Sequence, residues 1–265
     1  MKTVKILRVI VAILPFLLLS SCSGKKGDKY AFQYVTFKQT LPYEPGKENP
    51  RCNFDMRVLQ AYGTDTMFAD AFNKDISETL FNKNTTDVRS AMISFIDSII
   101  VNFKNDNLEL QEYAKQQKEV NPLGIGYDYV VETSVSYGNN RDIIGCHVNW
   151  YEYTGGAHGR TFITCRNYRL EDGSIVTLDD YLKPGYESVL IPILDNLLLR
   201  EAGCESRSEL DRHGYFSETP MFVPDNFEIR KDSIAFIFNQ YEIAPYSTGI
   251  TTLVVPENDI RKIIR

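Results

Sequence analysis

The sequence has few of the residues on which common metal and catalytic sites are built. Its 265 residues include five cysteines, three histidines and one tryptophan, and no Cys-x-x-Cys pair or Cys/His ligand spacing occurs. A structural zinc site therefore has little support, and neither a metal nor a cofactor is expected. The nucleophile-elbow sequence that is typical of α/β-hydrolases is also missing.

An excess of positive charge is absent as well. Lys and Arg together number 29 against 35 Asp and Glu, which gives a formal net charge of -6. Binding to nucleic acid depends on clustered cations that release counterions, so this balance argues against nucleic acid as a partner. It suits a basic protein ligand better, although an acidic charge also simply keeps an exported protein soluble.

No apolar run is long enough to span a bilayer. Lys2, Lys5 and Arg8 precede an apolar stretch from Val9 to Leu19. That stretch is about eleven residues long, whereas a spanning helix needs about 20. The pattern predicts a cleaved export signal over residues 1–21.

The segment Leu19-Ser20-Ser21-Cys22 resembles the bacterial lipobox. It predicts cleavage before Cys22 and acylation of the cysteine sulfur and the new amine. Two or three acyl chains, at about 0.8 kcal/mol per buried methylene, would anchor the protein to a membrane permanently. An ordinary signal peptide with a chance cysteine near its cleavage site is the alternative.

The residues after Cys22 bear on location. Cleavage removes three of the 29 cations and no acidic residue, so the mature chain would have a net charge of -9. Residues 22–29 are short, polar and glycine-bearing, as a tether between lipid and folded protein needs to be. Ser23 stands where many inner-membrane lipoproteins have aspartate, and no acidic run follows. We therefore expect the periplasmic face of an outer membrane.

Hydrophobic periodicity predicts an α+β fold for the rest of the chain. Strands are expected where apolar and polar residues alternate, and helices where apolar residues recur at every third or fourth position. The expected strands are 30–40, 52–61, 127–137, 142–153, 161–170, 226–229, 233–240 and 249–255, and the expected helices are 65–81, 86–103, 108–118, 187–201 and 257–264. We expect antiparallel sheets packed with helices in two adjoining modules, residues 30–154 and 155–265.

Four cysteines follow Cys22, namely Cys52, Cys146, Cys165 and Cys204, and they permit three disulfide connectivities in an oxidising compartment. If Gly155-Gly156 is the centre of a hairpin, Cys146 lies opposite Cys165. A cross-strand disulfide would then be possible at a closely spaced pair. Buried free thiols are the alternative.

The most distinctive segment of the mature chain is Tyr151 to Gly159, YEYTGGAHG. It resembles the junction between two paired modules of a bacterial extracytoplasmic family, the domains of unknown function DUF4163 and DUF3298. The resemblance continues through Thr177 to Leu182, Phe227 to Phe238 and Tyr241 to Gly249. It implies a DUF3298-like module at residues 155–265. A DUF4163-like module at 30–154 is matched more weakly.

Members of this family occur as lipoproteins, as the outer part of lysozyme-sensing anti-sigma factors, and as the accessory region of peptidoglycan deacetylases. The resemblance implies a lipid-anchored, non-catalytic binding protein of the cell envelope. Its ligand would be cell-wall-related, such as a peptidoglycan fragment, or a basic protein such as lysozyme.

His158 is the first candidate for ligand binding, because it follows two glycines and can titrate near neutral pH. Bracing of a glycine-rich connection is the structural alternative. A catalytic alternative is an envelope glycan hydrolase or deacetylase that uses His158. That reading needs a nucleophile such as Ser247 or Ser174 beside the imidazole.

Tyr241, Glu242 and Tyr246 are the other candidates for ligand binding. They lie near Pro245 and could line a groove for a sugar or a peptide. Aromatic residues beside proline and glycine also fix the ends of strands, so a structural role is the alternative. No residue is expected to be catalytic.

Overall fold

A five-stranded sheet runs through the first part of the molecule. The computed structural model describes residues 29–265 except 48, 119–123 and 139–141. Strand order follows the sequence, and every neighbouring pair is antiparallel except β2 and β3, which are parallel. The strands are β1 (Ala31–Pro42), β2 (Arg51–Tyr62), β3 (Tyr127–Tyr137), β4 (Ile143–Tyr153) and β5 (Arg160–Arg169).

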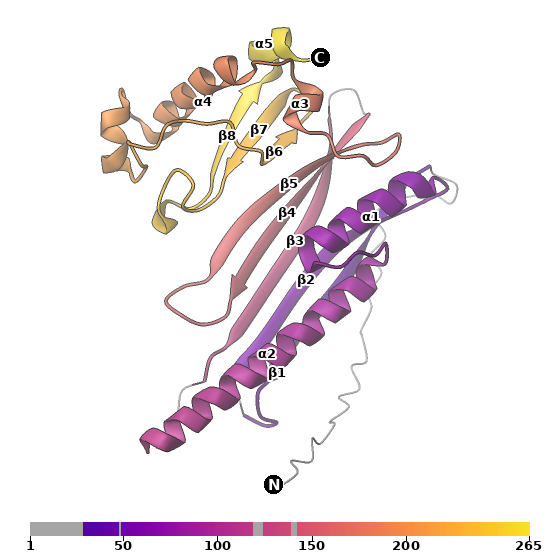
Figure 1. Cartoon of the computed structure of the whole chain (residues 1–265), viewed down its shortest axis with the longest axis vertical. Coiled ribbons are helices and arrows are strands. Elements are labelled where there is room, and N and C mark those ends of the chain that lie inside the picture. Colours follow the sequence, from indigo (N-terminus) through magenta and orange to yellow (C-terminus); the bar gives the residue numbers. More distant parts are fainter. Residues whose placement is uncertain (1–28, 48, 119–123, 139–141) are drawn as a thin grey trace.

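Two helices, α1 (Thr66–Phe81) and α2 (Val88–Gln117), connect β2 to β3 and lie along one face of this sheet (Figure 1). This crossover is why β2 and β3 pair in parallel. The two helices expected at 86–103 and 108–118 are one 30-residue helix. No Gly or Pro interrupts residues 103–108, and the amide of the buried Asn107 donates to Phe103 O within the helix. The predicted break was therefore wrong.

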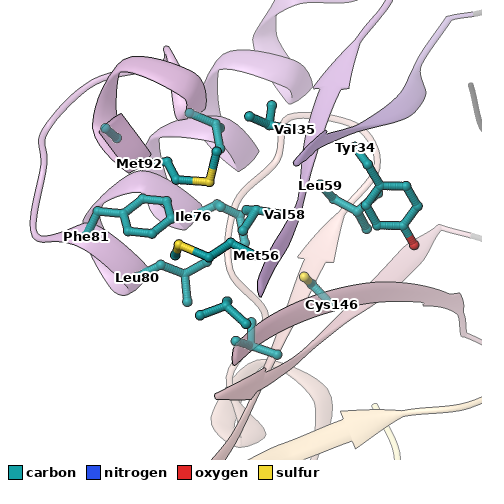
Figure 2. Packing of buried hydrophobic residues seen from close by; sticks show 14 of the residues in the cluster. Tyr34, Val35, Met56, Val58, Leu59, Ile76, Leu80, Phe81, Met92 and Cys146 are labelled. Atoms are coloured by element: carbon teal, nitrogen blue, oxygen red, sulfur yellow. The ribbon is translucent and has the colours of Figure 1, made fainter. Parts of the chain in front are cut away.

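The apolar stripe of α1 forms the centre of the first core. Phe68, Phe72 and Ile76 are fully buried, as the four-residue spacing predicts. Figure 2 shows Ile76 close to Met56 of β2 and Met92 of α2, between the helices and the sheet. Each such side chain contributes about 1.5–3 kcal/mol through burial, so helix and sheet stabilise one another.

A smaller sheet of order β6-β7-β8 forms a second unit, which lies beyond β5 in Figure 1. Its core contains Leu190, Leu194 and Leu198 of the helix α4 together with Phe236 and Phe238 of the sheet. Its elements are α3 (Leu178–Tyr181), α4 (Glu187–Ala202), η1 (Arg207–His213), β6 (Phe227–Ile229), β7 (Ser233–Phe238), η2 (Tyr246–Thr248), β8 (Thr251–Pro256), α5 (Glu257–Ile260) and η3 (Arg261–Ile263).

Local signals at helix ends agree with this arrangement. Thr177 and Asp180 form the capping box that their spacing predicts, and Gly203 adopts the left-handed conformation that ends α4. The closing helix expected at 257–264 is shorter, since α5 gives way to the 3-10 turn η3. The α+β class is confirmed.

At Ile163 and Cys165 the outer edge of β5 is bonded to side-chain amides instead of a sixth strand, whereas the end of β5 bonds to the backbone of Ser174 and Val176. Asn226 accepts from Cys165 N at 2.8 Å and donates to Ile163 O at 2.8 Å. Asn239 accepts from Ile163 N at 2.8 Å and donates to the same carbonyl at 3.0 Å. A side-chain amide carries one acceptor and paired donors, so it can stand in for a peptide group at a strand edge. The second unit is joined to the first sheet through these bonds.

Asn167 makes the reciprocal connection from β5. Its amide donates to Phe227 O at 2.8 Å and accepts from Ile229 N at 2.9 Å, both on β6. Only 2% of this residue is exposed, so its bonds are made away from water. We call Asn167, Asn226 and Asn239 the amide joint.

The expected pairing of Cys146 with Cys165 was wrong. Cys146 lies opposite Arg166, and Cys165 lies opposite His147, because the hairpin is centred on Gly156 and not between Gly155 and Gly156. A shift of one residue reverses the face of every side chain in a strand. Cys146 therefore faces the core beneath the helices and Cys165 faces the second unit, and Cys52, Cys146, Cys165 and Cys204 are all free and buried.

The N-terminal predictions cannot be placed on the structure. Cys22, the signal at 1–21 and all but the last residue of the 22–29 tether lie outside the described residues. Among the helices that the structure describes, none has the length and apolar character needed to cross a membrane.

We expect Asn167→Asp to lower the free energy of unfolding by about 1–3 kcal/mol, because the carboxylate cannot donate to Phe227 O and its charge would be buried. Urea unfolding followed by circular dichroism measures the change. Asn196→Asp, at an exposed position of α4, is the matched control. Equal midpoints for the two variants would contradict a supporting role for the amide joint.

Candidate binding site

Three of the four residues predicted to bind ligand lie together. The ring of His158, in the connection between β4 and β5, stacks on the ring of Tyr246 with centroids 3.8 Å apart and planes at 21°. The ring of Tyr241 lies 6.4 Å from that of Tyr246. His158 and Tyr241 are exposed, and Tyr246 is partly exposed. We call these three residues the aromatic cluster.

Glycines shape the connection that carries His158. Gly155 and Gly156 have φ values of +103° and +93°, which favour glycine. A Cβ at Gly159 would lie 2.5 Å from the ring of Tyr151, so only glycine allows this close approach. The hydroxyl of Tyr153 donates to Gly156 O at 3.1 Å. These contacts fix the path of the loop beneath the histidine.

Tyr241 occupies an unusual backbone conformation. Its φ of +71° lies in the left-handed region, which costs a bulky residue of order 1 kcal/mol or more. The turn is closed by Tyr241 N, which donates to Ala244 O at 2.8 Å, and by Asn239 N, which donates to the Glu242 carboxylate at 2.9 Å. The turn therefore presents the Tyr241 ring to solvent at a cost in backbone strain.

Glu242, the fourth predicted residue, is exposed and accepts a hydrogen bond from the backbone of this turn. Desolvation raises the pKa of its carboxyl, and the hydrogen bond from Asn239 N opposes that rise. Its described contact is with the backbone of its own turn. Glu242 therefore helps to hold the turn that positions Tyr241.

Two more residues belong to the site although the sequence did not single them out. Gln240 accepts from Thr161 N at 3.3 Å and donates to Tyr246 O at 3.5 Å, so it ties the two loops together. Desolvation raises the pKa of the Tyr151 phenol, and Asp128 and Tyr246 add to the rise. The ring of Tyr151 lies against Gly159, so it borders the loop that carries His158. The position of Tyr151 at the start of the segment YEYTGGAHG is the sequence feature that could have indicated its place in the site.

The arrangement offers ring faces and hydroxyls more than it offers acid–base chemistry. Among the contacts that the structure describes, the His158 ring meets Tyr246 and, through Nδ1, Gly159 O at 3.0 Å. Neither contact supplies a carboxylate that would orient the imidazole or a nucleophile that it would activate. These side chains can therefore contribute ring stacking and hydrogen bonds to a ligand.

A separate cleft of about 320 Å³ opens where the two units meet. Its walls include Cys165 and Asn167 of β5, Thr177 and Asp179 at the start of α3, and Asp225 before β6. The sequence predicts only a strand at 161–170 and the start of a helix in this region. The segments that form the cleft are distant in sequence, so no local pattern could have indicated it.

One group of side chains in the described part of the chain has the donor set of a metal site. The ligand atoms of His147, Cys165 and Glu228 lie within 4.8 Å of one another. His158 is not among them. Burial raises the pKa of the Cys165 thiol to about 12.

Two known families match separate segments of the chain. The family described as "Protein of unknown function (DUF3298)" matches residues 179–258, and the family described as "Deacetylase PdaC" matches residues 46–161. The later part of the chain is therefore similar to the DUF3298 module, and the earlier part is similar to the PdaC family. The DUF4163 assignment and the division at residues 154 and 155 stay predictions.

Solved structures share the fold. A DUF3298 family member from Bacteroides fragilis superimposes with a TM-score of 0.80 at 22% identity, covering 91% of this chain and 96% of the other. A DUF3298 family protein from Pseudomonas aeruginosa gives a TM-score of 0.57 at 18% identity, over 90% and 95% of the two chains.

Two curated relatives are enzymes by name. The peptidoglycan-N-acetylmuramic acid deacetylase PdaC of Bacillus subtilis is 23% identical over 197 residues, which are 73% of this chain and 39% of the relative. An esterase of Mycobacterium tuberculosis is 29% identical over 119 residues, which are 43% of this chain and 48% of the relative. The chain spans less than half of each relative.

We expect Tyr246→Leu to move the NMR signals of the His158 ring protons downfield, toward those of a free histidine. Stacked rings 3.8 Å apart shield one another through the aromatic ring current, and leucine removes that effect. Tyr113→Leu, at a 60% exposed tyrosine of α2, is the control. Unchanged His158 signals in Tyr246→Leu would exclude the stacked pair in solution.

Proposed function

We propose that this chain is a non-catalytic binding protein of the cell envelope, which recognises a peptidoglycan fragment through the aromatic cluster. The observation that carries the proposal is the set of three rings, two of them exposed, at the meeting point of two loops. The C–H groups on one face of a sugar ring fit against an aromatic face, and tyrosine hydroxyls can bond to the sugar hydroxyls at the edge.

The backbone at Tyr241 supports the same interpretation. Strained conformations persist where the surrounding structure imposes them, and they gather at functional sites. Here the strain presents a 58% exposed tyrosine beside Tyr246, where a purely structural role would bury the ring. The turn is therefore better explained by a surface ligand than by packing.

The relatives supply the ligand class. The name of the Bacillus subtilis relative refers to the N-acetylmuramic acid of peptidoglycan, and 73% of the present chain aligns with it. A module found beside an enzyme that acts on the wall would hold that enzyme against its polymer. In the present chain the same module would act as a sensor or adaptor anchored by lipid at Cys22, on the periplasmic face of an outer membrane.

A basic protein such as lysozyme is the second candidate ligand. The observation in its favour is the formal net charge of -6, which steers a cationic protein toward the chain at low ionic strength. Tyrosine-rich surfaces also serve as centres of protein interfaces. Salt dependence separates the two ligands, because salt screens the attraction between oppositely charged proteins much more than the stacking of a tyrosine ring on the face of a sugar ring.

The test is calorimetric titration of the mature chain with soluble peptidoglycan fragments and, separately, with lysozyme. We expect binding of the fragments, weakened about tenfold or more in Tyr241→Ala and in Tyr246→Ala and unchanged in Tyr113→Ala. Binding of lysozyme but not of the fragments, with the lysozyme binding lost at high salt, would favour the second candidate. No heat from either ligand would overturn both.

The catalytic alternative has its own readout in the same samples. A hydrolase or deacetylase would release reducing ends or acetate from peptidoglycan, and the release would stop in His158→Ala while the fold persisted. We expect no release above that of a heat-denatured control.

A further inference from the structure

A buried cluster of three different donor groups lies between the two units, away from the aromatic cluster. It consists of the imidazole of His147 on β4, the thiol of Cys165 on β5 and the carboxylate of Glu228 on β6. Cys165 is 6% exposed and Glu228 is 5% exposed, and His147 is partly exposed. The three strands belong to two different sheets, and the residues are far apart in sequence.

The separations fit a common coordination centre. Cys165 Sγ lies 3.6 Å from His147 Nδ1, and all three ligand atoms lie within 4.8 Å of one another. Ligands at about 2.3 Å for sulfur and about 2.05 Å for nitrogen, at a tetrahedral angle, are about 3.6 Å apart. The sulfur and nitrogen are therefore already spaced as two neighbouring ligands of one zinc ion.

The carboxylate is held in position by its own partners. Ser136 donates its hydroxyl to Glu228 Oε1 at 2.6 Å, and Arg230 donates from Nε to Oε2 at 2.8 Å. The side chain lies over Gly145, where an added Cβ would be 3.1 Å from Glu228 Cγ. Hydrogen bonds to ligating carboxylates are the usual outer support of metal sites, and each oxygen keeps a further lone pair for a cation.

The site also has access to solvent. Cys165 forms part of the wall of the 320 Å³ cleft between the units, and His147 is partly exposed, so the cluster is not sealed from solvent. A thiolate, an imidazole and a carboxylate together suit zinc, because hard cations such as magnesium and calcium prefer oxygen alone. Three protein ligands leave a fourth position for water.

We propose that His147, Cys165 and Glu228 bind one Zn²⁺ and thereby join β4 and β5 of the first sheet to β6 of the second. On binding, the ion would displace the Cys165 thiol proton to solvent, replace the thiol–imidazole contact by two metal–ligand bonds, and add a third bond to the carboxylate, which also pairs with Arg230. Zinc would then stabilise the contact between the two units in addition to the amide joint. This proposal does not depend on the proposed function.

To test this, the reduced mature chain is equilibrated with Zn²⁺ and passed through gel filtration to remove unbound metal. The zinc that stays with the protein is then measured by mass spectrometry of the metal. We expect about one zinc per wild-type chain and a loss of at least tenfold in His147→Ala and in Cys165→Ser. Cys146→Ser is the matched control, because that cysteine lies on the other face of the same sheet. It should retain the wild-type content.

Two further measurements keep the proposal falsifiable if a variant folds poorly. Co²⁺ bound to wild type should give the near-ultraviolet charge-transfer absorption of a cobalt–thiolate bond, and Zn²⁺ should raise the melting temperature of wild type and of Cys146→Ser. Equal zinc content in wild type and Cys165→Ser, or Co²⁺ binding without that absorption, would overturn the proposal. So would a wild-type chain that retains no zinc.

Discussion

Side-chain amides at the outer edge of β5 determine how the two units of this protein meet. A strand edge that is not exposed to water needs partners for its N–H and C=O groups. Asn226 and Asn239 supply them from the second unit, and Asn167 returns the same kind of bond to β6. At Ile163 and Cys165 these partners are side chains, so the second sheet does not continue the first there.

The amide joint also positions the residues around it. Asn239 and Gln240 directly precede Tyr241, so their bonds to β5 fix where the chain brings Tyr246 against His158 and Tyr241 beside Tyr246. Asn167 fixes β6 in the same way, which places Glu228 beside Cys165. The exposed aromatic cluster and the buried donor cluster therefore depend on one set of backbone contacts, although their chemistry differs.

Much of the fold could be predicted because local periodicity reflects burial. Alternation at 127–137 and a four-residue spacing in Phe68, Phe72 and Ile76 led to a strand and a helix that the structure contains. The same reasoning failed for α2, where a polar stretch after Phe103 resembled a helix end but buries Asn107. It also failed for Cys146, because a hairpin centre that is wrong by half a residue reverses the face of the side chain.

The sequence by itself determined most of the helices and strands, the caps at Thr177 and Gly203, and the aromatic and glycine residues available at 151–159 and 241–249, since each depends mainly on neighbours within a few positions. Only the tertiary structure decided which groups meet. His158 reaches Tyr246, and His147 and Cys165 reach Glu228, through strand register and the contact between two sheets. Those are long-range properties, and no local spacing of residues encodes them.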